Sequence, residues 1–379
     1  MRERGSRGRR LLSGLLLIGA ALVVAAVLAE VALRAAKLPG ITYHTFQYDD
    51  VTGQRFYPNT KLIYRNARGE DVTRAVNDWG YLDRDHALAK PDGVVRIGFF
   101  GDSFTEARQV PLDSTFSSRA ERALNTAATR TRYECIAIGM MGYGTLQSYL
   151  ECRRWMDRLA LDEVVYVFCE NDPGNLVPAL NKSDACPYPL IVNDSLAVDR
   201  SFATRYANKR RCPHRTWQYL KSHTLLFSTL ETRLHLLRSH GVRMRVDDAD
   251  RLMGSPGKHA SLSENTPPSA MPDSLRTQCM RLTESVVLEW KLHVEAAGRR
   301  FTILYVPRPS EALKPEAERD NWAPWLMEFC ARNDVAIVNP SERFFVRGNR
   351  GEELFYDHLT SRGHALLAAA FLDGRARAR

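Results

Sequence analysis

A serine near position 100 and a histidine near the C-terminus are the residues of this sequence best placed for nucleophilic chemistry. Ser103 lies in the turn Gly-Asp-Ser-Phe-Thr, directly after an apolar run at residues 94–100. A serine hydroxyl is a weak nucleophile until a base takes its proton, so Ser103 requires a histidine. Backbone N–H groups at a helix start after this turn would favour an oxyanion formed beside Ser103. The alternative is a plain helix cap, because Asp-Ser after a strand is common there.

His358 is the best candidate for that base among the ten histidines. It lies in a loop, after a strand-like approach and just before the last predicted helix. Others, such as His223, His235, His259 and His293, fall in helical or polar segments and are interpreted as solvated or structural. His364 is interpreted as structural as well. The alternative for His358 is a capping or turn histidine.

The predicted elements place both residues in an α/β fold. Strands at 94–100, 133–138 and 164–168 alternate with helices at 106–124 and 146–161. The alternation continues with a helix at 274–297, a strand at 301–306, a helix at 315–332, a strand at 335–338 and a helix from about 361 to 372. This pattern predicts a doubly wound parallel sheet in three layers, which binds its ligands at the carboxyl ends of the strands.

The remaining segments divide the chain further. Residues 38–90 are expected to form a lead-in of short strands and loops, and residues 91–180 and 273–372 the α/β domain. Residues 181–272 interrupt the alternation as a helical insertion, with a mobile Ser/Pro/Gly-rich stretch at 254–272. A helix predicted at 217–237 carries a stripe of leucines on one face, which we expect to pack as core or cap (Leu226, Leu230, Leu234 and Leu237).

The N-terminus predicts a membrane anchor. Residues 11–29 are apolar apart from Ser13 and small residues, and five arginines precede them within a basic tail at residues 1–10. The length is close to the roughly 20 residues that cross a bilayer, so we expect a signal-anchor helix at 11–33. The arginines predict a cytoplasmic tail, with everything after about Lys37 on the extracytoplasmic, periplasmic side of the cytoplasmic membrane. A signal peptide cleaved after Ala29 and a buried soluble helix are the alternatives.

Composition excludes other classes of function. The chain has 379 residues and a net charge of +9, but arginines crowd both ends and the part between them is nearly neutral in sum. No nucleic-acid-binding signature is present, so no nucleic-acid partner is expected. The seven cysteines form no C-x-x-C pair, which argues against a structural metal. Cys186 and Cys212 would be the favoured disulfide pair in an oxidising compartment.

Four motifs together resemble a known family. They are the block at 101–105, Gly139 in a Gly-Met-Met-Gly-Tyr-Gly-Thr turn, Asn171-Asp172 after the third strand, and Asp357-His358. Their order resembles that of the SGNH (GDSL-like) hydrolases, in particular a membrane-anchored bacterial branch. The resemblance covers roughly residues 94–180 and 275–372. It implies a flavodoxin-like three-layer sheet and no metal or organic cofactor.

The resemblance also implies roles for individual residues. Ser103 would attack an ester carbonyl and His358 would act as its general base. The backbone N–H groups of Ser103 and Gly139, with the side-chain amide of Asn171, would form the oxyanion hole. Each such donor contributes about 3–4 kcal/mol in acyl transfer.

The sequence departs from the family at the carboxylate of the triad. The family's aspartate, three residues before the histidine, is Phe355 here, and Asp357 directly precedes His358. Adjacent side chains in an extended loop point apart, so Asp357 reaches the imidazole only if the chain turns sharply. Glu352, Glu353 or a backbone carbonyl in a Ser-His dyad are the alternatives. Ala107 and Cys169 also stand where the family often has glycine.

The resulting functional hypothesis is a membrane-anchored extracytoplasmic serine esterase. Its partners would be the membrane and an O-acyl ester, with acetyl favoured, on a carbohydrate such as an acylated polysaccharide or on a lipid. A polysaccharide O-acetyltransferase using the same site is the first alternative. The second is a catalytically inactive carbohydrate-binding or assembly protein, because the expected aspartate is missing at position 355.

Overall fold

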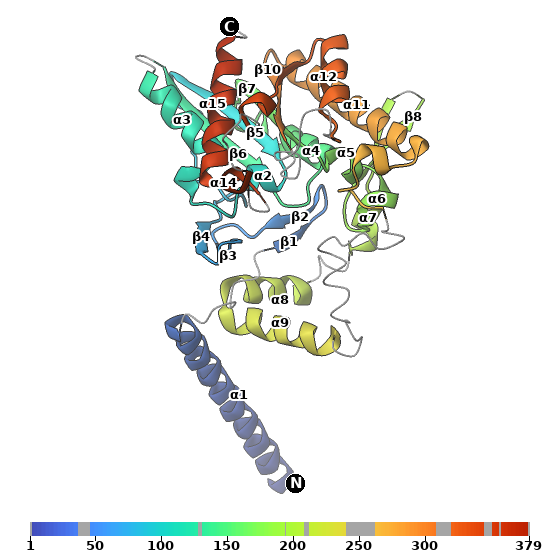
Figure 1. Cartoon of the computed structure of the whole chain (residues 1–379). Coiled ribbons are helices and arrows are strands. Elements are labelled where there is room, and N and C mark those ends of the chain that lie inside the picture. The colour runs from blue at the N-terminus through green and yellow to red at the C-terminus, as the bar shows by residue number, and fades with distance from the viewer. Residues whose placement is uncertain are drawn as a thin grey trace. The chain divides into compact units, whose positions relative to one another are not determined.

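The computed structural model describes residues 2–36, 46–127, 131–193, 195–207, 212–239, 262–307, 320–344, 351–355 and 358–377 (Figure 1). The chain divides into two compact units. One, here called the helical unit, comprises residues 1–45 and 212–255. The other, the sheet unit, comprises residues 46–211 and 256–379. We describe each unit by itself.

The sheet unit is built on five parallel strands, as the sequence predicts. They are β5 (Val94–Gly101), β6 (Arg132–Gly139), β7 (Glu163–Cys169), β10 (Arg300–Val306) and β11 (Ala336–Val338). Their spatial order is β11-β10-β7-β5-β6, and every pairing is parallel. Counted along the chain, this is the doubly wound order 2-1-3-4-5, whose direction of winding reverses between β5 and β7.

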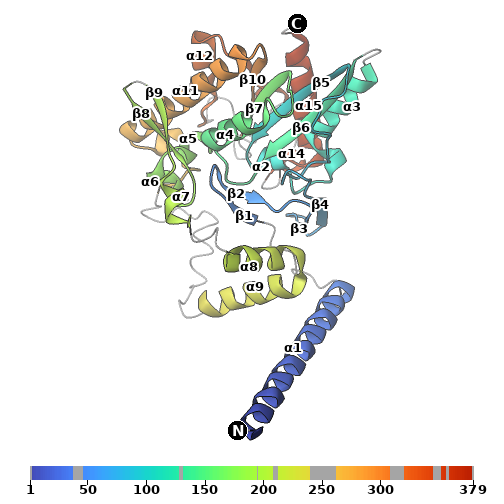
Figure 2. The ribbon, with the colours of Figure 1, turned by 180° about the vertical axis from the view of Figure 1, so that it is seen from behind.

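Helices cover both faces of the sheet (Figures 1 and 2). On one face, α4 (Thr145–Trp155), α11 (Asp273–Ala296) and α12 (Ala323–Arg332) pack on alternate strand residues such as Phe100, Tyr166 and Ile303. On the other face, α3 (Phe116–Ala127) and α15 (Ser361–Arg377) pack on the residues between them, such as Phe99 and Val165. Strands buried on both faces read as continuous apolar runs, which is why the sequence reveals them. Residues 315–319 of the predicted helix 315–332 lie outside the described residues.

The helix predicted at 106–124 is wrong in its first half. The helix that begins at the nucleophile, α2 (Ser103–Glu106), is a single turn, because Ala107 adopts a left-handed conformation with φ 51° and ends it. A short 3-10 turn, η1 (Leu112–Ser114), follows Pro111, and α3 begins only at Phe116. Proline cannot continue a helix through its own N–H, so Pro111 separates α2 from α3.

Short hairpins and turns frame the sheet. The lead-in forms two antiparallel hairpins, as expected: β1 (Phe46–Asp49) with β2 (Gly53–Phe56), and β3 (Lys61–Arg65) with β4 (Asp71–Ala75). A third hairpin joins β8 (Tyr188–Val192) to β9 (Ser195–Asp199). The short helical turns of this unit are α5 (Asp172–Asn175), α6 (Pro178–Asn181), α7 (Ser201–Arg205), η3 (Pro268–Ala270), α13 (Ser341–Phe344) and α14 (Gly351–Leu354).

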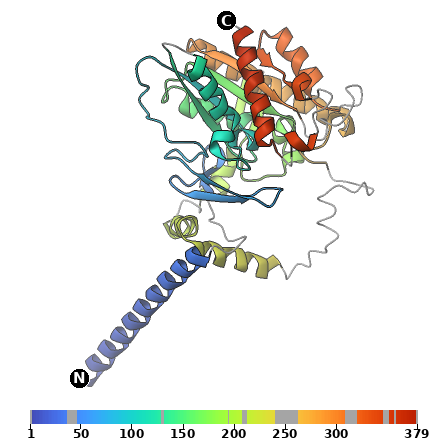
Figure 3. The same ribbon diagram turned by 60° about the vertical axis from the view of Figure 1, so that its left-hand side comes forward.

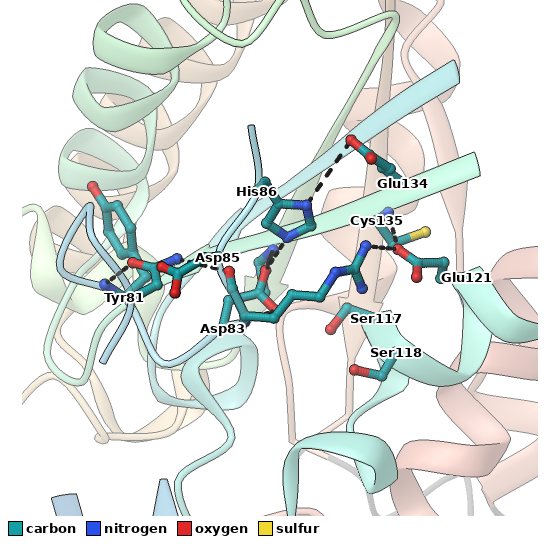
Figure 4. Close-up of polar contacts among 12 residues, drawn as sticks. Tyr81, Asp83, Asp85, His86, Ser117, Ser118, Glu121, Glu134 and Cys135 are labelled. Atoms are coloured by element: carbon teal, nitrogen blue, oxygen red, sulfur yellow. Dashed lines mark hydrogen bonds and ion pairs between the residues drawn. The ribbon is translucent and has the colours of Figure 1, made fainter. Parts of the chain in front are cut away.

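Side chains close the open edge of β6 (Figure 4). The outward N–H groups of Tyr133, Cys135 and Ala137 donate to the side-chain oxygens of Asn125, Glu121 and Asp83, at 2.8 Å each. Buried His86 lies 3.3 Å from the Asp83 carboxylate. An edge strand with unpaired N–H groups invites pairing with another chain, so this network both fastens the lead-in segment and blocks that edge.

The helical unit contains α1 (Arg2–Ala36), α8 (Cys212–His223) and α9 (Leu225–Ser239) (Figure 3). The window Leu12–Ala36 of α1 has a mean hydropathy of 2.6 and is 0% buried, so it is long and apolar enough to span a membrane. The single helix predicted at 217–237 is two helices, interrupted at Thr224. The expected core packing of the leucine stripe is wrong for Leu230 and Leu234, which are 44% and 36% exposed.

The expected disulfide is absent. All seven cysteines are free thiols, and six of them are buried. Cys186 lies in the sheet unit, within 3.6 Å of the Asn181 side-chain nitrogen, whereas Cys212 begins α8 of the helical unit. The two residues share a polar stretch of sequence but belong to separate units. Of the 254–272 stretch expected to be mobile, residues 254–261 lie outside the described residues, and the described remainder contains η3.

Candidate active site

Ser103 lies at the carboxyl end of β5, where the winding of the sheet reverses. Close contact between this turn and its neighbours requires glycine at two positions. A Cβ atom on Gly101 would lie 2.4 Å from Thr105 Oγ1, and one on Gly139 would lie 2.5 Å from Thr105 Cβ. The two glycines are also directly paired across β5 and β6. They therefore let the loop at residues 139–144, here called the candidate oxyanion loop, approach the turn that carries Ser103.

His358 meets Ser103 across 255 positions of sequence. Its Nε2 atom lies 2.8 Å from Ser103 Oγ, which is hydrogen-bonding distance. The ring of Phe104 packs on the imidazole with 4.9 Å between ring centres. A β-bridge between Phe355 and Leu359 brackets the loop that carries His358. Ser103 and His358 are both half-buried, so the pair is accessible from solvent.

Asp102 organises the amides of the nucleophile turn. Its carboxylate accepts the N–H of Phe104 at 2.9 Å, and its backbone oxygen accepts the N–H groups of Thr105 and Glu106. The first N–H groups of a helix have no partner within it, and these three are satisfied by Asp102. Among the contacts described in this turn, the N–H of Ser103 is paired with no acceptor of the protein.

The candidate oxyanion loop is held from two sides at Met141. The N–H of Met141 donates to the Glu106 carboxylate at 2.6 Å, and its carbonyl accepts from Gln54 Nε2 at 2.9 Å. Glu106 also forms an ion pair with Arg108. The hydroxyl of Tyr143 adds a bond to the Gln54 carbonyl at 2.8 Å. The loop that carries Gly139 is therefore fastened to both the nucleophile helix and the β1–β2 hairpin.

Asn171 reaches the same point from the end of β7. Its side chain favours the charged form of the Asp102 carboxylate and so opposes the rise in the pKa of Asp102, and the Cys169 thiol donates to that carboxylate at 3.2 Å. Burial raises the pKa of Asp102 despite these hydrogen bonds. Burial and the neighbouring Asp102 charge raise the pKa of Asp172 well above its usual range, although Tyr166 and the Cys169 N–H donate to it. The Asp102 carboxylate thus links Asn171 to the nucleophile turn.

Of the candidate carboxylate partners of His358, the structure describes only one side chain, that of Glu353. Asp357 and the side chain of Glu352 lie outside the described residues. The Glu353 carboxylate forms an ion pair with Arg362. Phe355, at the position where the family has aspartate, is 4% exposed and packs in the core beneath α15. The described residues hold no cluster of three metal-binding side chains.

Sequence reasoning identified the residues that meet at the site but missed those that hold them. Ser103, Gly139, Asn171 and His358 converge at one edge of the sheet, as expected. Glu106, Gln54 and Arg74 were not anticipated. For Glu106 the sequence offers one signal. Glu106 follows Ser103 by three residues, in a turn that packs on the sheet, so its carboxylate is expected to be buried and to need a partner. Gln54 and Arg74 lie in the lead-in segment, and nothing in the sequence indicates their roles.

Arg74 supports the segment that follows the nucleophile helix. Its Nη1 donates to the carbonyls of Ala107 and Val110 at 2.7 and 3.0 Å, and its Nη2 donates to the Leu82 carbonyl. The side chain belongs to β4 and is buried. Burial lowers the pKa of Arg74 to about 10, so the guanidinium remains charged at neutral pH. The αL turn at Ala107 is thus stabilised from the lead-in.

Comparisons with known proteins give similarities of fold. An α/β hydrolase from the metagenome of Lake Arreo matches with 12% identity and a TM-score of 0.40, over 77% of this chain and 98% of that one. A lipase/acylhydrolase from Enterococcus faecalis matches with 12% identity and a TM-score of 0.38, over 74% and 94%. An acetylxylan esterase from Geobacillus stearothermophilus matches with 11% identity and a TM-score of 0.40, over 74% and 93%. No family model and no curated protein matches the sequence.

The chain resembles SGNH hydrolases in its motifs and in where the fold puts them. The strand order places the turns that follow β5 and β7 on either side of the reversal point, where such folds bind ligands. Ser103 and Asn171 lie in those two turns, each two residues after its strand ends. The hydrogen bond from the Cys169 thiol to the Asp102 carboxylate joins the two strand ends across that point.

Proposed function

We propose that this protein is a serine esterase that forms an acyl-enzyme on Ser103. The observation that carries the proposal is the 2.8 Å contact between His358 Nε2 and Ser103 Oγ. A nucleophile within hydrogen-bonding distance of its base is the geometry that serine acyl transfer requires. The proposed oxyanion donors, which are the N–H groups of Ser103 and Gly139 and the amide of Asn171, lie at or just after the ends of the neighbouring strands β5, β6 and β7.

The chemistry follows from this geometry. Ser103 Oγ attacks the acyl carbonyl carbon while His358 Nε2 takes the hydroxyl proton, and the carbonyl oxygen becomes an oxyanion among the three donors. The intermediate collapses to the Ser103 ester, and His358 returns the proton to the departing alcohol. Water then attacks the ester by the same route and releases the acid. Asp357 is the proposed carboxylate that orients His358 and stabilises its charged form.

We place the enzyme at the outer surface of the cytoplasmic membrane, held by α1. The five arginines before the span favour a cytoplasmic N-terminus. Contacts of α1 support an anchor that stays with the mature protein. Glu30 accepts the N–H groups of Leu225 and Leu226 at 3.1 and 2.8 Å, and Arg34 donates to the His223 carbonyl at 3.1 Å. Cleavage after Ala29 would separate this junction from the apolar span.

The proposed substrates are O-acyl esters, with acetyl favoured, on carbohydrate or lipid outside the membrane. Two of the similar structures are described as acetyl xylan esterases, and another as an esterase active on acetylated mannans. Acyl transfer to a sugar hydroxyl uses the same first half-reaction and differs only in the acceptor. An inactive carbohydrate-binding protein is the alternative if Ser103 proves unreactive.

The test is labelling and turnover of the full-length protein in detergent. We expect a fluorophosphonate probe to label the wild type, with loss of labelling in Ser103→Ala. We also expect p-nitrophenyl acetate hydrolysis to fall to background in Ser103→Ala and His358→Ala. Ser285→Ala is the matched control, because Ser285 is half-buried on α11 and its hydroxyl bonds only within that helix in the described contacts. An unlabelled wild type would favour the binding protein.

Product analysis separates hydrolysis from transfer. With an acetylated xylan oligosaccharide as donor, an esterase releases acetate whether or not a second sugar is added. A transferase releases little acetate alone and acetylates an added unacetylated oligosaccharide. Mass spectrometry of the sugars and quantification of acetate distinguish the two directly.

A further inference from the structure

The helices α8 and α9 form a hairpin that is joined to the outer end of α1. Glu30 directly follows the apolar run at 11–29 and caps the first turn of α9 through two backbone N–H groups. Arg34, ion-paired with Glu30, contacts the last residue of α8. Both hairpin helices run across the end of α1 rather than along it (Figures 1 and 3). A span oriented through a bilayer would therefore carry this hairpin at the level of the headgroups.

The hairpin exposes two leucines and buries three polar side chains. Leu230 and Leu234, one helical turn apart on α9, are 44% and 36% exposed, while Lys221, Ser222 and Ser228 are buried. Residues four apart lie on one face of a helix, so the two leucines form a continuous apolar strip. Helices of 12 and 15 residues are marginal in water on their own. An apolar surface that covers the two exposed leucines would therefore stabilise the hairpin.

The sequence that contains the hairpin is strongly basic. Between Arg205 and Arg245 the sequence has ten lysines and arginines and one acidic residue, Glu231, which is a net charge of +9. Glu231 is engaged inside the hairpin, where its carboxylate accepts from Trp217 at 3.0 Å and pairs with Lys221 at 3.1 Å. Arg215 and Arg233 remain exposed on α8 and α9. The middle of the chain is nearly neutral in sum, but it contains this one local basic segment.

We infer that the α8–α9 hairpin lies on the outer leaflet of the membrane that α1 crosses, with Leu230 and Leu234 among the acyl chains and its basic residues against anionic phospholipid headgroups. Leucines on one face and arginines around them are the composition of interfacial helices. Anionic headgroups attract Lys and Arg that lie within a few ångströms of the surface. The inference rests on the proposed anchoring by α1 and adds a second attachment to it.

The test uses full-length protein in nanodiscs that contain phosphatidylglycerol. In a Cys212→Ser background, single cysteines replace Leu230, Leu22 or Leu88 and carry an environment-sensitive fluorophore. Leu22 lies within α1, and Leu88 is 47% exposed on the sheet unit as the control for an aqueous position. We expect the label at 230 to be quenched by lipids with a nitroxide near the headgroup. We also expect iodide to quench it several-fold less than the label at 88.

Each other outcome overturns a defined part of the proposed arrangement. If iodide quenches the labels at 230 and 88 equally, the strip faces water and the inference is wrong. Protection from iodide without quenching by lipid would mean that protein covers the strip, either a second copy or the chain's own sheet unit. A label at 22 that deep lipid nitroxides do not quench would refute the anchor, while esterase activity would still report on the site. Charge reversal at Arg215 and Arg233 should lower lipid quenching at 230 several-fold.

Discussion

The Glu106 carboxylate accepts the backbone N–H of Met141 at 2.6 Å. Glu106 is the last residue of the single-turn helix that begins at Ser103, and Met141 follows Gly139 by two residues. This contact joins the helix that carries the proposed nucleophile to the loop that carries Gly139, the proposed oxyanion donor. The Glu106 side chain is buried, so the hydrogen bond is shielded from competing water.

Removal of that contact should affect turnover more than binding. In Glu106→Ala we expect kcat for p-nitrophenyl acetate to fall by about tenfold to a hundredfold with KM nearly unchanged, the scale for a small misplacement near the reacting atoms. Glu106→Gln retains an acceptor for Met141 and should recover most of kcat. Equal losses in both variants, together with equal losses in Tm, would show that Glu106 serves only stability.

The carboxylate that orients His358 can be found by comparing three variants. We expect Asp357→Asn to lower kcat by up to about 10⁴-fold, the scale for loss of a triad aspartate, with a smaller effect if the turn between residues 357 and 358 is incomplete. Glu353→Gln is the matched control, because its carboxylate is paired with Arg362. Steady-state kinetics decides the assignment. A collapse in Glu352→Gln alone would transfer the role to Glu352.

His364 should make the protein sensitive to acid. It is fully buried against Phe116, whose N–H donates to its Nδ1, and burial lowers the pKa of His364 to about 3. The unfolded chain binds a proton near pH 6.5, so the unfolded state gains protons first as pH falls. Stability should therefore decline from about pH 6.5 towards pH 3, by about 1 kcal/mol per pH unit while this group dominates.

The pH dependence can be separated from a general loss of packing. Urea unfolding between pH 7 and pH 4 should show a shallower decline in His364→Gln than in the wild type. Phe371→Leu, a change in the core beside His364 on the same helix, should lower stability by a similar amount at every pH. If His364→Gln retains the wild-type slope, another group is responsible for the acid sensitivity.

Arg74 should contribute more to the free energy of unfolding than its position in a short hairpin suggests. Arg74→Met removes the donors of three buried carbonyls, at Leu82, Ala107 and Val110, and we expect a loss of about 2–4 kcal/mol. Arg65→Met in the same hairpin is the control, because its ion pair with Asp71 is exposed and should change the urea midpoint little. Equal midpoints for the two variants would contradict this role.

The sequence by itself determined the secondary-structure elements and the candidate residues, because both depend on residues that are close together in the chain. The apolar runs that became β5, β6, β7 and β10 are recognisable because each strand is buried on both faces. Ser103, Gly139 and Asn171 lie at or within two residues of the ends of β5, β6 and β7, and parallel strands bring their carboxyl ends to one edge. His358 was recognisable from its loop before the last helix.

Only the tertiary structure decided the contacts that turn these residues into a site. Ser103 and His358 are 255 positions apart, and Glu106, Gln54 and Arg74 gain their roles from partners that no local pattern reveals. The same holds for Ala107, whose left-handed conformation ends a helix that its sequence would continue, and for Leu230, whose helical stripe is exposed rather than packed. Local propensity depends on a residue and its neighbours, whereas burial and hydrogen bonding depend on which distant segments the sheet order brings together.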